Sequence, residues 1–158
     1  MKEAKRRFPL SIHGFCLMPN HIHLIVRALH AENLSAFMQW LAGCYSRHFH
    51  ESYGTSGHLW QGRFKGIPID SEEYLIVALR YVEGNPKRAG LVDSNRKWEW
   101  SSLGDHCARD YTKLIDAPPF YLADGWLELV DTPLNSNEFE TVRRAKRVSP
   151  APGRDPTD

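Results

Sequence analysis

Apolar and polar residues alternate near the start of the chain in a pattern that predicts a β-hairpin followed by a helix. Residues 10–18 and 21–29 are predicted as two strands, and Pro19-Asn20 between them suits a tight turn. Asn33 can then cap a helix whose apolar residues recur at the spacing of one helical face. These residues are Leu34, Phe37, Leu41, Tyr45 and Phe49. We expect this helix to serve core packing.

A second helix is predicted after an extended segment at residues 58–69. Asp70 and Glu73 have the spacing of a capping box, so this helix should start at Ser71. It should run to about Asn85, because the following proline disfavours helical geometry in the residue before it and removes a donor. Tyr81 would then lie four residues before Asn85 on the same helical face.

Two histidines flank one apolar residue in the second predicted strand. Because side chains alternate along a strand, His21, His23 and Ile25 should share one face. The apolar residues that should pack on the other face are Ile22, Leu24 and Val26. Neutral imidazoles are common metal ligands, so the pair is half of a metal site. The alternative is a partly buried or surface histidine pair, and the pattern alone carries no function.

Composition indicates one domain and a tail. The chain has 158 residues, of which 42% are apolar, and this suffices for a real core. It contains no apolar run long enough to span a bilayer and no secretory signal pattern, so we expect a cytoplasmic protein that does not bind membranes. The three cysteines lack the spacing of a disulfide framework or zinc site and should be reduced. They are Cys16, Cys44 and Cys107.

Charge alone does not predict a nucleic-acid partner, because the net charge is only +1. The basic residues nonetheless form clusters that could serve a short DNA hairpin. These clusters are Lys2, Lys5, Arg6 and Arg7; Arg63 and Lys65; Lys87 and Arg88; and Arg143, Arg144, Lys146 and Arg147. A solvated surface is the alternative for each cluster.

The last part of the chain predicts a packed extension. Residues 136–147 should form a short basic helix with Phe139 and Val142 on its apolar side. The tryptophans that should pack this extension onto the domain are Trp98, Trp100 and Trp126. Proline, glycine and charge predict disorder from residue 149 onward.

Four motifs occur in a fixed order along the chain. They are Leu-Met-Pro-Asn-His-Ile-His at 17–23, Leu-Trp-Gln-Gly-Arg-Phe at 59–64, Arg-Tyr-Val-Glu-x-Asn-Pro-x-Arg-Ala-Gly-Leu-Val at 80–92, and Trp-x-Trp-Ser-Ser-Leu at 98–103. Together they resemble the REP-associated tyrosine transposases, single-tyrosine members of the HUH (His-hydrophobic-His) endonuclease superfamily. The resemblance is close over residues 8–103 and looser through residues 125–147.

The resemblance implies a metal-dependent endonuclease and strand transferase for single-stranded or hairpin DNA. Tyr81 would be the nucleophile that forms a 5′-phosphotyrosine, and Mg²⁺ or Mn²⁺ would be held by His21, His23 and Asn85. The residue types alone leave Tyr74 and Tyr45 as equal candidates for the nucleophile. They also leave Asn85 as an ordinary residue at a helix end before proline.

The resemblance also suggests residues that contact DNA. They are Arg63, Lys65, Lys87 and Arg88, and Trp60 and Phe64 either stack on an unpaired base or fill the core. A domesticated module that recognises palindromic repeats without cutting is the alternative function. A third hypothesis is a metal-dependent phosphodiesterase in which Tyr81 is only structural.

The implied fold is α+β, with a ferredoxin-like antiparallel sheet, helices on one face and a C-terminal helical tail. Residues 1–103 would form the catalytic domain, 104–148 an extension packed on it, and 149–158 a disordered tail. The first strand of the family sheet is expected to be absent here. A misassigned start codon, a truncation or a decayed gene copy would each explain this.

Overall fold

The computed structural model describes residues 1–112 and 114–148, so the disorder predicted for residues 149–158 lies outside the described part. The chain divides into two compact units that we describe separately. The described residues of the first unit are Met1–Leu10 and Ala28–Ile67, and those of the second are Ser11–Arg27, 68–112 and 114–148. No helix in the described part is long and apolar enough to cross a membrane.

The first unit consists of two helices and a long loop. The helices are α1 (Lys2–Arg7) and α2 (Ala31–Tyr53), and they pack on each other. Of the apolar residues on the predicted face of α2, only Phe37 is fully buried. After α2 the chain forms no regular element up to Ser71, so residues 58–69 are non-regular rather than a paired strand.

The start of α2 differs from the prediction. The helix begins at Ala31 with His30 at the cap position, so the prediction of Asn33 as the cap is wrong. The Asn33 side-chain nitrogen instead lies 3.4 Å from the Pro9 carbonyl oxygen, to which it donates a hydrogen bond. A polar side chain that bonds to another segment is not available to cap its own helix.

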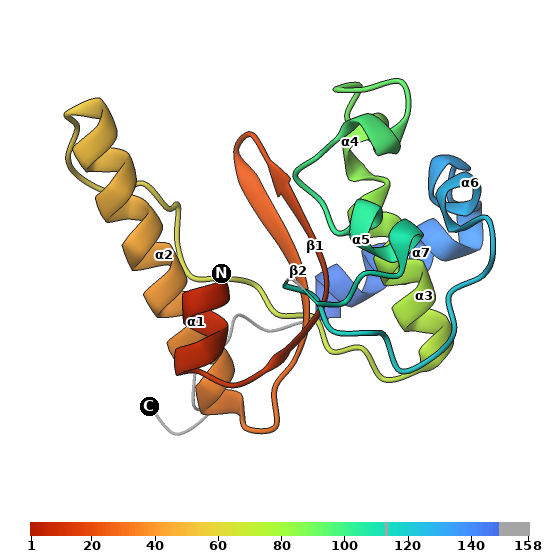
Figure 1. Ribbon diagram of the computed structural model, residues 1–158, viewed down its shortest axis with the longest axis horizontal. Helices are drawn as coiled ribbons and strands as arrows, with labels where there is room; N and C mark the ends of the chain where they lie inside the picture. The colour runs from red at the N-terminus through yellow and green to blue at the C-terminus, as the bar shows by residue number, and fades with distance from the viewer. Residues whose placement is uncertain (113, 149–158) are drawn as a thin grey trace. The chain divides into compact units, whose positions relative to one another are not determined.

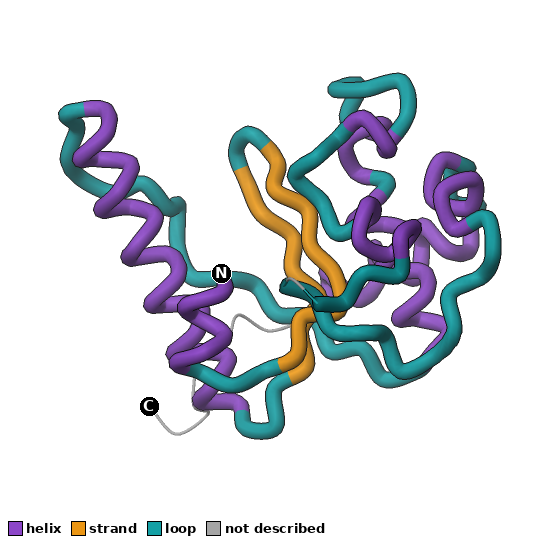
Figure 2. The backbone as a smooth tube through the Cα atoms, viewed as in Figure 1, coloured by secondary structure: helices purple, strands orange, loops and turns teal. Residues whose placement is uncertain are grey.

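The second unit contains a β-hairpin, drawn in orange in Figure 2. Strands β1 (Ser11–Met18) and β2 (His21–Arg27) pair antiparallel, and Met18 is opposite His21 across the two-residue turn. This confirms the predicted hairpin and an α+β fold. The described residues contain no third strand, only an isolated bridge between Cys16 and Ser101.

Helix α3 (Glu72–Glu83) packs on this hairpin. Its cap is Ser71, whose hydroxyl oxygen accepts a hydrogen bond from the Tyr74 amide at 3.1 Å. The capping box predicted from Asp70 and Glu73 is therefore wrong. Ser71 itself has the extended backbone of an N-cap residue, which makes its side chain the nearest acceptor for the first turn.

The end of α3 also differs from the prediction of a helix running to about Asn85. The helix ends at Glu83, and a short helix, α4 (Asn85–Arg88), follows after Gly84. Pro86 lies in the first turn of α4, where its missing N–H leaves no hydrogen bond unmade. Tyr81 and Asn85 therefore belong to consecutive helices rather than to one helical face.

The other helices of the second unit lie around α3 (Figure 1). They are the 3₁₀ turn η1 (Asn95–Lys97), α5 (Leu103–Ala108), α6 (Trp126–Asp131) and α7 (Ser136–Val148). The predicted C-terminal helix is confirmed, with Val142 buried. Trp126 is also buried, but Trp100 is 62% exposed, so its predicted packing role is wrong.

One core joins the hairpin to the helices. Its buried members include Cys16, Ile25, Leu79, Leu103 and Trp126. On β2 the buried residue Ile25 lies on the face that also carries the two histidines, whereas the residues of the other face are half-buried. The histidine face of β2 is therefore the one directed at α3, which also packs on β2.

Two buried carboxylate interactions tie helices to α3. The Glu83 carboxylate accepts hydrogen bonds from Ser102, from His106 Nδ1 at 2.7 Å and from Trp126 Nε1 at 2.8 Å. Arg80 forms an ion pair with Glu138 at the start of α7. Both α3 residues are buried, and an unpaired charge at either position would be costly.

Gly84 provides the first stability prediction. An added Cβ at this position would lie 2.7 Å from the Arg80 carbonyl oxygen and 3.1 Å from the Val130 carbonyl oxygen. Because both neighbours are backbone atoms, Gly84→Ala should lower the free energy of unfolding by about 1–3 kcal/mol. Urea unfolding followed by circular dichroism measures this loss.

Gly104 on α5 is the matched control, since an added Cβ there meets nothing within 4 Å. Gly104→Ala should leave the unfolding midpoint unchanged or slightly higher, because alanine favours helices. Equal stability of Gly84→Ala and the parent protein would show that the turn after α3 can relax.

Candidate active site

The two histidines of β2 lie close together at the end of the hairpin. Their Nε2 atoms are 3.1 Å apart, and their rings are nearly perpendicular. His21 Nδ1 lies 2.7 Å from the Asn20 side-chain oxygen, which orients the ring so that Nε2 faces His23. The turn residue Asn20 therefore helps to fix the histidine pair.

Asn85 completes a three-residue cluster with these histidines. Its side-chain nitrogen is 3.4 Å from His21 Nε2, and the residue is buried although it follows the end of α3. The packing of α3 on β2 brings the start of α4 to the hairpin. The structure thus brings together His21, His23 and Asn85, from two segments more than 60 residues apart in the sequence.

The donor atoms of this cluster fit a divalent cation. Two ligand atoms that each lie about 2.1 Å from one ion, at right angles to each other, are separated by about 3.0 Å. The 3.1 Å between the two Nε2 atoms agrees with this separation. Among the described residues no three His, Cys, Asp or Glu side chains could hold a metal, so a third protein ligand here would be of another residue type, and the Asn85 amide lies beside the pair. The Asn85 oxygen would have to turn toward the histidines to serve.

Tyr81 lies beside the histidines on the last turn of α3. Its ring centroid is 5.8 Å from that of His23, and the two rings are nearly perpendicular. A cavity of about 140 Å³ adjoins the tyrosine and is lined by Phe139, Val142 and Arg143 of α7. The predicted nucleophile is therefore next to the predicted metal ligands and also borders an open space.

Arg88 connects Tyr81 with Asn85. Its guanidinium carbon lies 4.1 Å above the centre of the Tyr81 ring. One nitrogen of the guanidinium donates to the Tyr81 carbonyl at 2.8 Å and to the Asn85 side-chain oxygen at 2.9 Å. Loss of water on this contact lowers the pKa of Arg88, and attraction to Tyr81 opposes the lowering.

Cys16 is opposite His23 in the hairpin but is not suited to bind a metal. Burial raises the pKa of its thiol to about 12, and the nearby charge of Glu83 acts in the same direction. A metal ligand must be the thiolate, which this environment disfavours. The side chain is fully buried and belongs to the core.

The other predicted DNA-binding residues are divided between the two units. Arg63 and Lys65 are exposed on the long loop of the first unit. Lys87 is exposed in the second unit, where its amine donates to the Asp131 carbonyl at 3.0 Å. Trp60 is half-buried, and its ring nitrogen donates to the Ala42 carbonyl at 3.1 Å, which matches the core-filling alternative more closely than base stacking.

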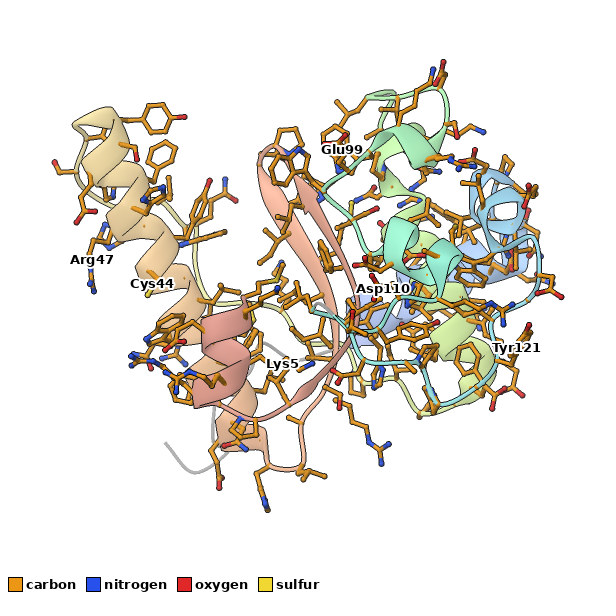
Figure 3. All side chains as sticks on the ribbon, viewed as in Figure 1. Lys5, Cys44, Arg47, Glu99, Asp110 and Tyr121 are labelled. Carbon is orange, nitrogen blue, oxygen red and sulfur yellow. The ribbon has the colours of Figure 1, made fainter. Side chains whose placement is uncertain are left out.

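The basic residues on α1 and α2 differ in their surroundings. Arg6 and Arg7 both bond to Glu3, and these bonds lower the pKa of Glu3 to about 2. Arg47 projects outward from α2 and is exposed (Figure 3). Part of the charge at the start of the chain is therefore balanced locally.

Comparison with known proteins places the chain in a family. The family described as Transposase IS200 like matches residues 1–85, which is more than half of the chain. This chain belongs to the IS200-like transposase family. The match includes both histidines, Tyr81 and Asn85.

Two relatives of this chain agree with the resemblance drawn from the motifs. A REP-associated tyrosine transposase of Haemophilus influenzae is 26% identical over 113 residues, covering 65% of this chain and 64% of that protein. A solved structure, that of a REP-associated tyrosine transposase bound to a REP hairpin, is 20% identical. It covers 79% of this chain and 70% of its own, with a TM-score of 0.55, and therefore shows the shared fold.

Two groups of residues were missed by reasoning from the sequence. The buried Glu83 network and the Arg80–Glu138 pair join segments that are distant in sequence, so no spacing pattern reveals them. Arg88 was predicted to contact DNA, but its contact with Tyr81 and with Asn85 was not foreseen. Its position seven residues after Tyr81 in the same motif is the one signal that was present.

Proposed function

We propose that this protein is a divalent-cation-dependent endonuclease and strand transferase for single-stranded or hairpin DNA. Tyr81 would attack the DNA phosphate, and His21, His23 and Asn85 would hold Mg²⁺ or Mn²⁺. The observation that carries the proposal is the convergence of the histidine pair, Asn85 and Tyr81 from two separate segments. Membership in the IS200-like transposase family supports the same reaction class.

Tyr81 would carry out a transesterification in which the number of phosphate ester bonds is conserved. The phenol loses its proton, and its oxygen forms a bond to phosphorus. The bond from phosphorus to the 3′ oxygen breaks, and that oxygen takes up a proton as a 3′-hydroxyl. The products are a 5′-phosphotyrosine and a free 3′ end, so the reverse attack rejoins strands without ATP.

The surrounding residues would orient the reacting groups. The Arg88 guanidinium lies over the Tyr81 ring, and the His23 ring contacts it at nearly a right angle. These two contacts would limit rotation of the Tyr81 side chain and so orient its hydroxyl. When bound between the histidines, a divalent cation would neutralise charge on the scissile phosphate. Imidazole nitrogens together with an amide oxygen are a ligand set that Mn²⁺ and Mg²⁺ accept.

A hairpin is the substrate we propose, because a structural relative is described as bound to a REP hairpin. A net charge of +1 suits a short folded DNA better than a long duplex. The residues proposed to contact its backbone are Arg63, Lys65, Lys87 and Arg88. We also propose Arg143 as a contact to the DNA backbone, because it lines the cavity beside Tyr81.

The proposal is tested by trapping the covalent intermediate. The protein is incubated with a labelled hairpin oligonucleotide carrying a single-stranded flank, with Mn²⁺ or with EDTA, and resolved on a denaturing gel. We expect a labelled protein band with Mn²⁺ and none with EDTA. Binding of the hairpin without any adduct would contradict cleavage and favour the module that binds palindromic repeats without cutting.

The histidine pair gives a second prediction. His21→Ala or His23→Ala should lower adduct formation by about 100-fold or more, because a single remaining imidazole holds the cation weakly. His48→Ala is the control, since His48 is exposed on α2 in the other unit. Full activity of His21→Ala would remove the histidines from the proposed site. An effect of His21→Ala without an effect of Asn85→Ala would assign the third ligand position to water or another side chain.

A further inference from the structure

The Asn85 amide is held from both sides. Its oxygen accepts a hydrogen bond from Arg88 at 2.9 Å, while its nitrogen lies 3.4 Å from His21 Nε2. An amide nitrogen is a donor only, and an unprotonated imidazole nitrogen is an acceptor. In this orientation the amide therefore satisfies Arg88 and the histidine pair without a cation.

A cation between the histidines requires the opposite orientation. The amide must turn so that its oxygen faces His21 and His23, which directs its NH₂ group at Arg88. Guanidinium and NH₂ groups are both donors only, so this arrangement leaves no acceptor between them. Arg88 in its present position and a cation at the histidines therefore compete for the one side-chain oxygen of Asn85.

We propose that Arg88 withholds the Asn85 oxygen from the histidine pair until a DNA phosphate takes up the guanidinium. The inference rests on the proposed function, since it concerns the same cation site. It assigns to Arg88 a positioning role that links DNA binding to completion of the ligand set.

The surroundings of Arg88 make the exchange feasible. The guanidinium contacts an aromatic face, a backbone carbonyl and an amide oxygen, and part of the side chain reaches solvent. A phosphate offers it two charged oxygens in the geometry that suits a guanidinium fork, and such charge-assisted bonds are the stronger ones. A phosphate placed for attack by Tyr81 would come close to Arg88, which already covers the Tyr81 ring.

The mechanism requires reciprocal coupling between DNA and the cation. If the phosphate releases Asn85, DNA binding must tighten Mn²⁺ binding, and Mn²⁺ must tighten DNA binding by the same factor. A variant that lacks the Arg88 donors should bind Mn²⁺ more tightly than the parent protein even when no DNA is present. It should also reduce the coupling to the part that the attraction between phosphate and cation supplies by itself.

The test measures Mn²⁺ affinity from the electron paramagnetic resonance signal of the free ion. Without DNA, Arg88→Met should bind Mn²⁺ about tenfold more tightly than the parent protein, the size expected for loss of a competing hydrogen bond to a charged group. Loss of a positive charge near the site would also tighten binding. The comparison is therefore repeated in an Asn85→Ala background, where we expect a gain of less than about twofold.

The second arm adds an uncleaved hairpin oligonucleotide to Tyr81→Phe protein, which keeps the aromatic face under Arg88. At hairpin concentrations that saturate both proteins, the hairpin should tighten Mn²⁺ binding more in Tyr81→Phe than in the double variant with Arg88→Met, in which only the attraction of the phosphate to the cation remains. Arg88→Leu provides a second side chain without donors if Arg88→Met does not fold, as judged by its thermal transition.

The outcomes separate this inference from the proposed function. If His21→Ala weakens Mn²⁺ binding but Arg88→Met leaves it unchanged, the inference is wrong and the cation site stands. An equal gain from Arg88→Met with and without Asn85 also overturns it, because charge alone then explains the effect. If His21→Ala does not weaken Mn²⁺ binding, the cation site of the proposed function fails first.

Discussion

Tyr81→Phe will abolish the covalent protein–DNA adduct and leave hairpin affinity within about twofold of the parent. The substitution removes one oxygen, which is the atom proposed to bond to phosphorus, and it retains the ring that contacts Arg88 and His23. Loss of a nucleophile costs about three orders of magnitude or more in rate. The adduct is measured on denaturing gels and the affinity by fluorescence anisotropy.

Tyr74 is the matched control because it lies on the same helix, two turns before Tyr81. Burial raises the pKa of the Tyr74 hydroxyl, and the charge of Asp70 acts in the same direction, so its phenolate is disfavoured. Tyr74→Phe should form the adduct at the parental rate. An adduct that persists in Tyr81→Phe and disappears in Tyr74→Phe would assign the nucleophile to Tyr74.

Local patterns were sufficient for the elements that depend on neighbouring residues. The turn at Pro19-Asn20 and the alternation of the strands predicted the hairpin, whose register then fixed His21 and His23 on one face. The two imidazoles meet because residues two apart on a strand point the same way. For these two residues the sequence pattern alone was enough to predict their relative position.

Helix ends were predicted less well, because several polar residues competed to be the cap. Asp70 and Glu73 have suitable spacing, but Ser71 has both the backbone conformation and the hydroxyl position of the cap. The effect of the proline after Asn85 was likewise recognised but placed two residues late. Small differences in local energy decide such boundaries, and the tertiary contacts that settle them are absent from a local pattern.

The choice of Tyr81 came from motif context and not from its chemistry, since Tyr74 and Tyr45 are equal by residue type. The structure supplies a physical distinction, because Tyr81 contacts both His23 and Arg88 while Tyr45 belongs to the other unit. For Asn85, one contact was predicted and another was not. Its closeness to His21 was predicted, but its hydrogen bond to Arg88 depends on how α4 follows α3.

Glu83→Ala will cause the largest loss of stability among single substitutions in the second unit. The Glu83 carboxylate is fully buried and accepts three hydrogen bonds, from Ser102 and His106 of α5 and its cap and from Trp126 of α6. Ser102 also accepts a hydrogen bond from the Phe15 amide, so the network continues into β1. Truncation at 83 leaves buried donors unpaired and opens a cavity among them.

Each unpaired buried donor costs about 1–3 kcal/mol, and the substitution leaves three donors without the carboxylate. We expect a loss of about 3–5 kcal/mol, which is a large part of the 5–15 kcal/mol of an ordinary domain. Urea unfolding followed by tryptophan fluorescence measures it, since Trp126 lies in the network. Because Glu83 is two residues after Tyr81 on α3, Glu83→Ala should also lower adduct formation through misplacement of the nucleophile.

Glu99→Ala is the control for this prediction, because Glu99 is exposed (Figure 3) and should change stability by less than about 0.5 kcal/mol. Glu83→Gln separates hydrogen bonding from charge. Its amide retains the volume and one acceptor oxygen but directs an NH₂ group at a neighbouring donor, so the loss should lie between those of the parent and Glu83→Ala. A Glu83→Ala protein that unfolds at the parental urea concentration would mean that Ser102, His106 and Trp126 find other partners, and that this network does not hold the helices around α3.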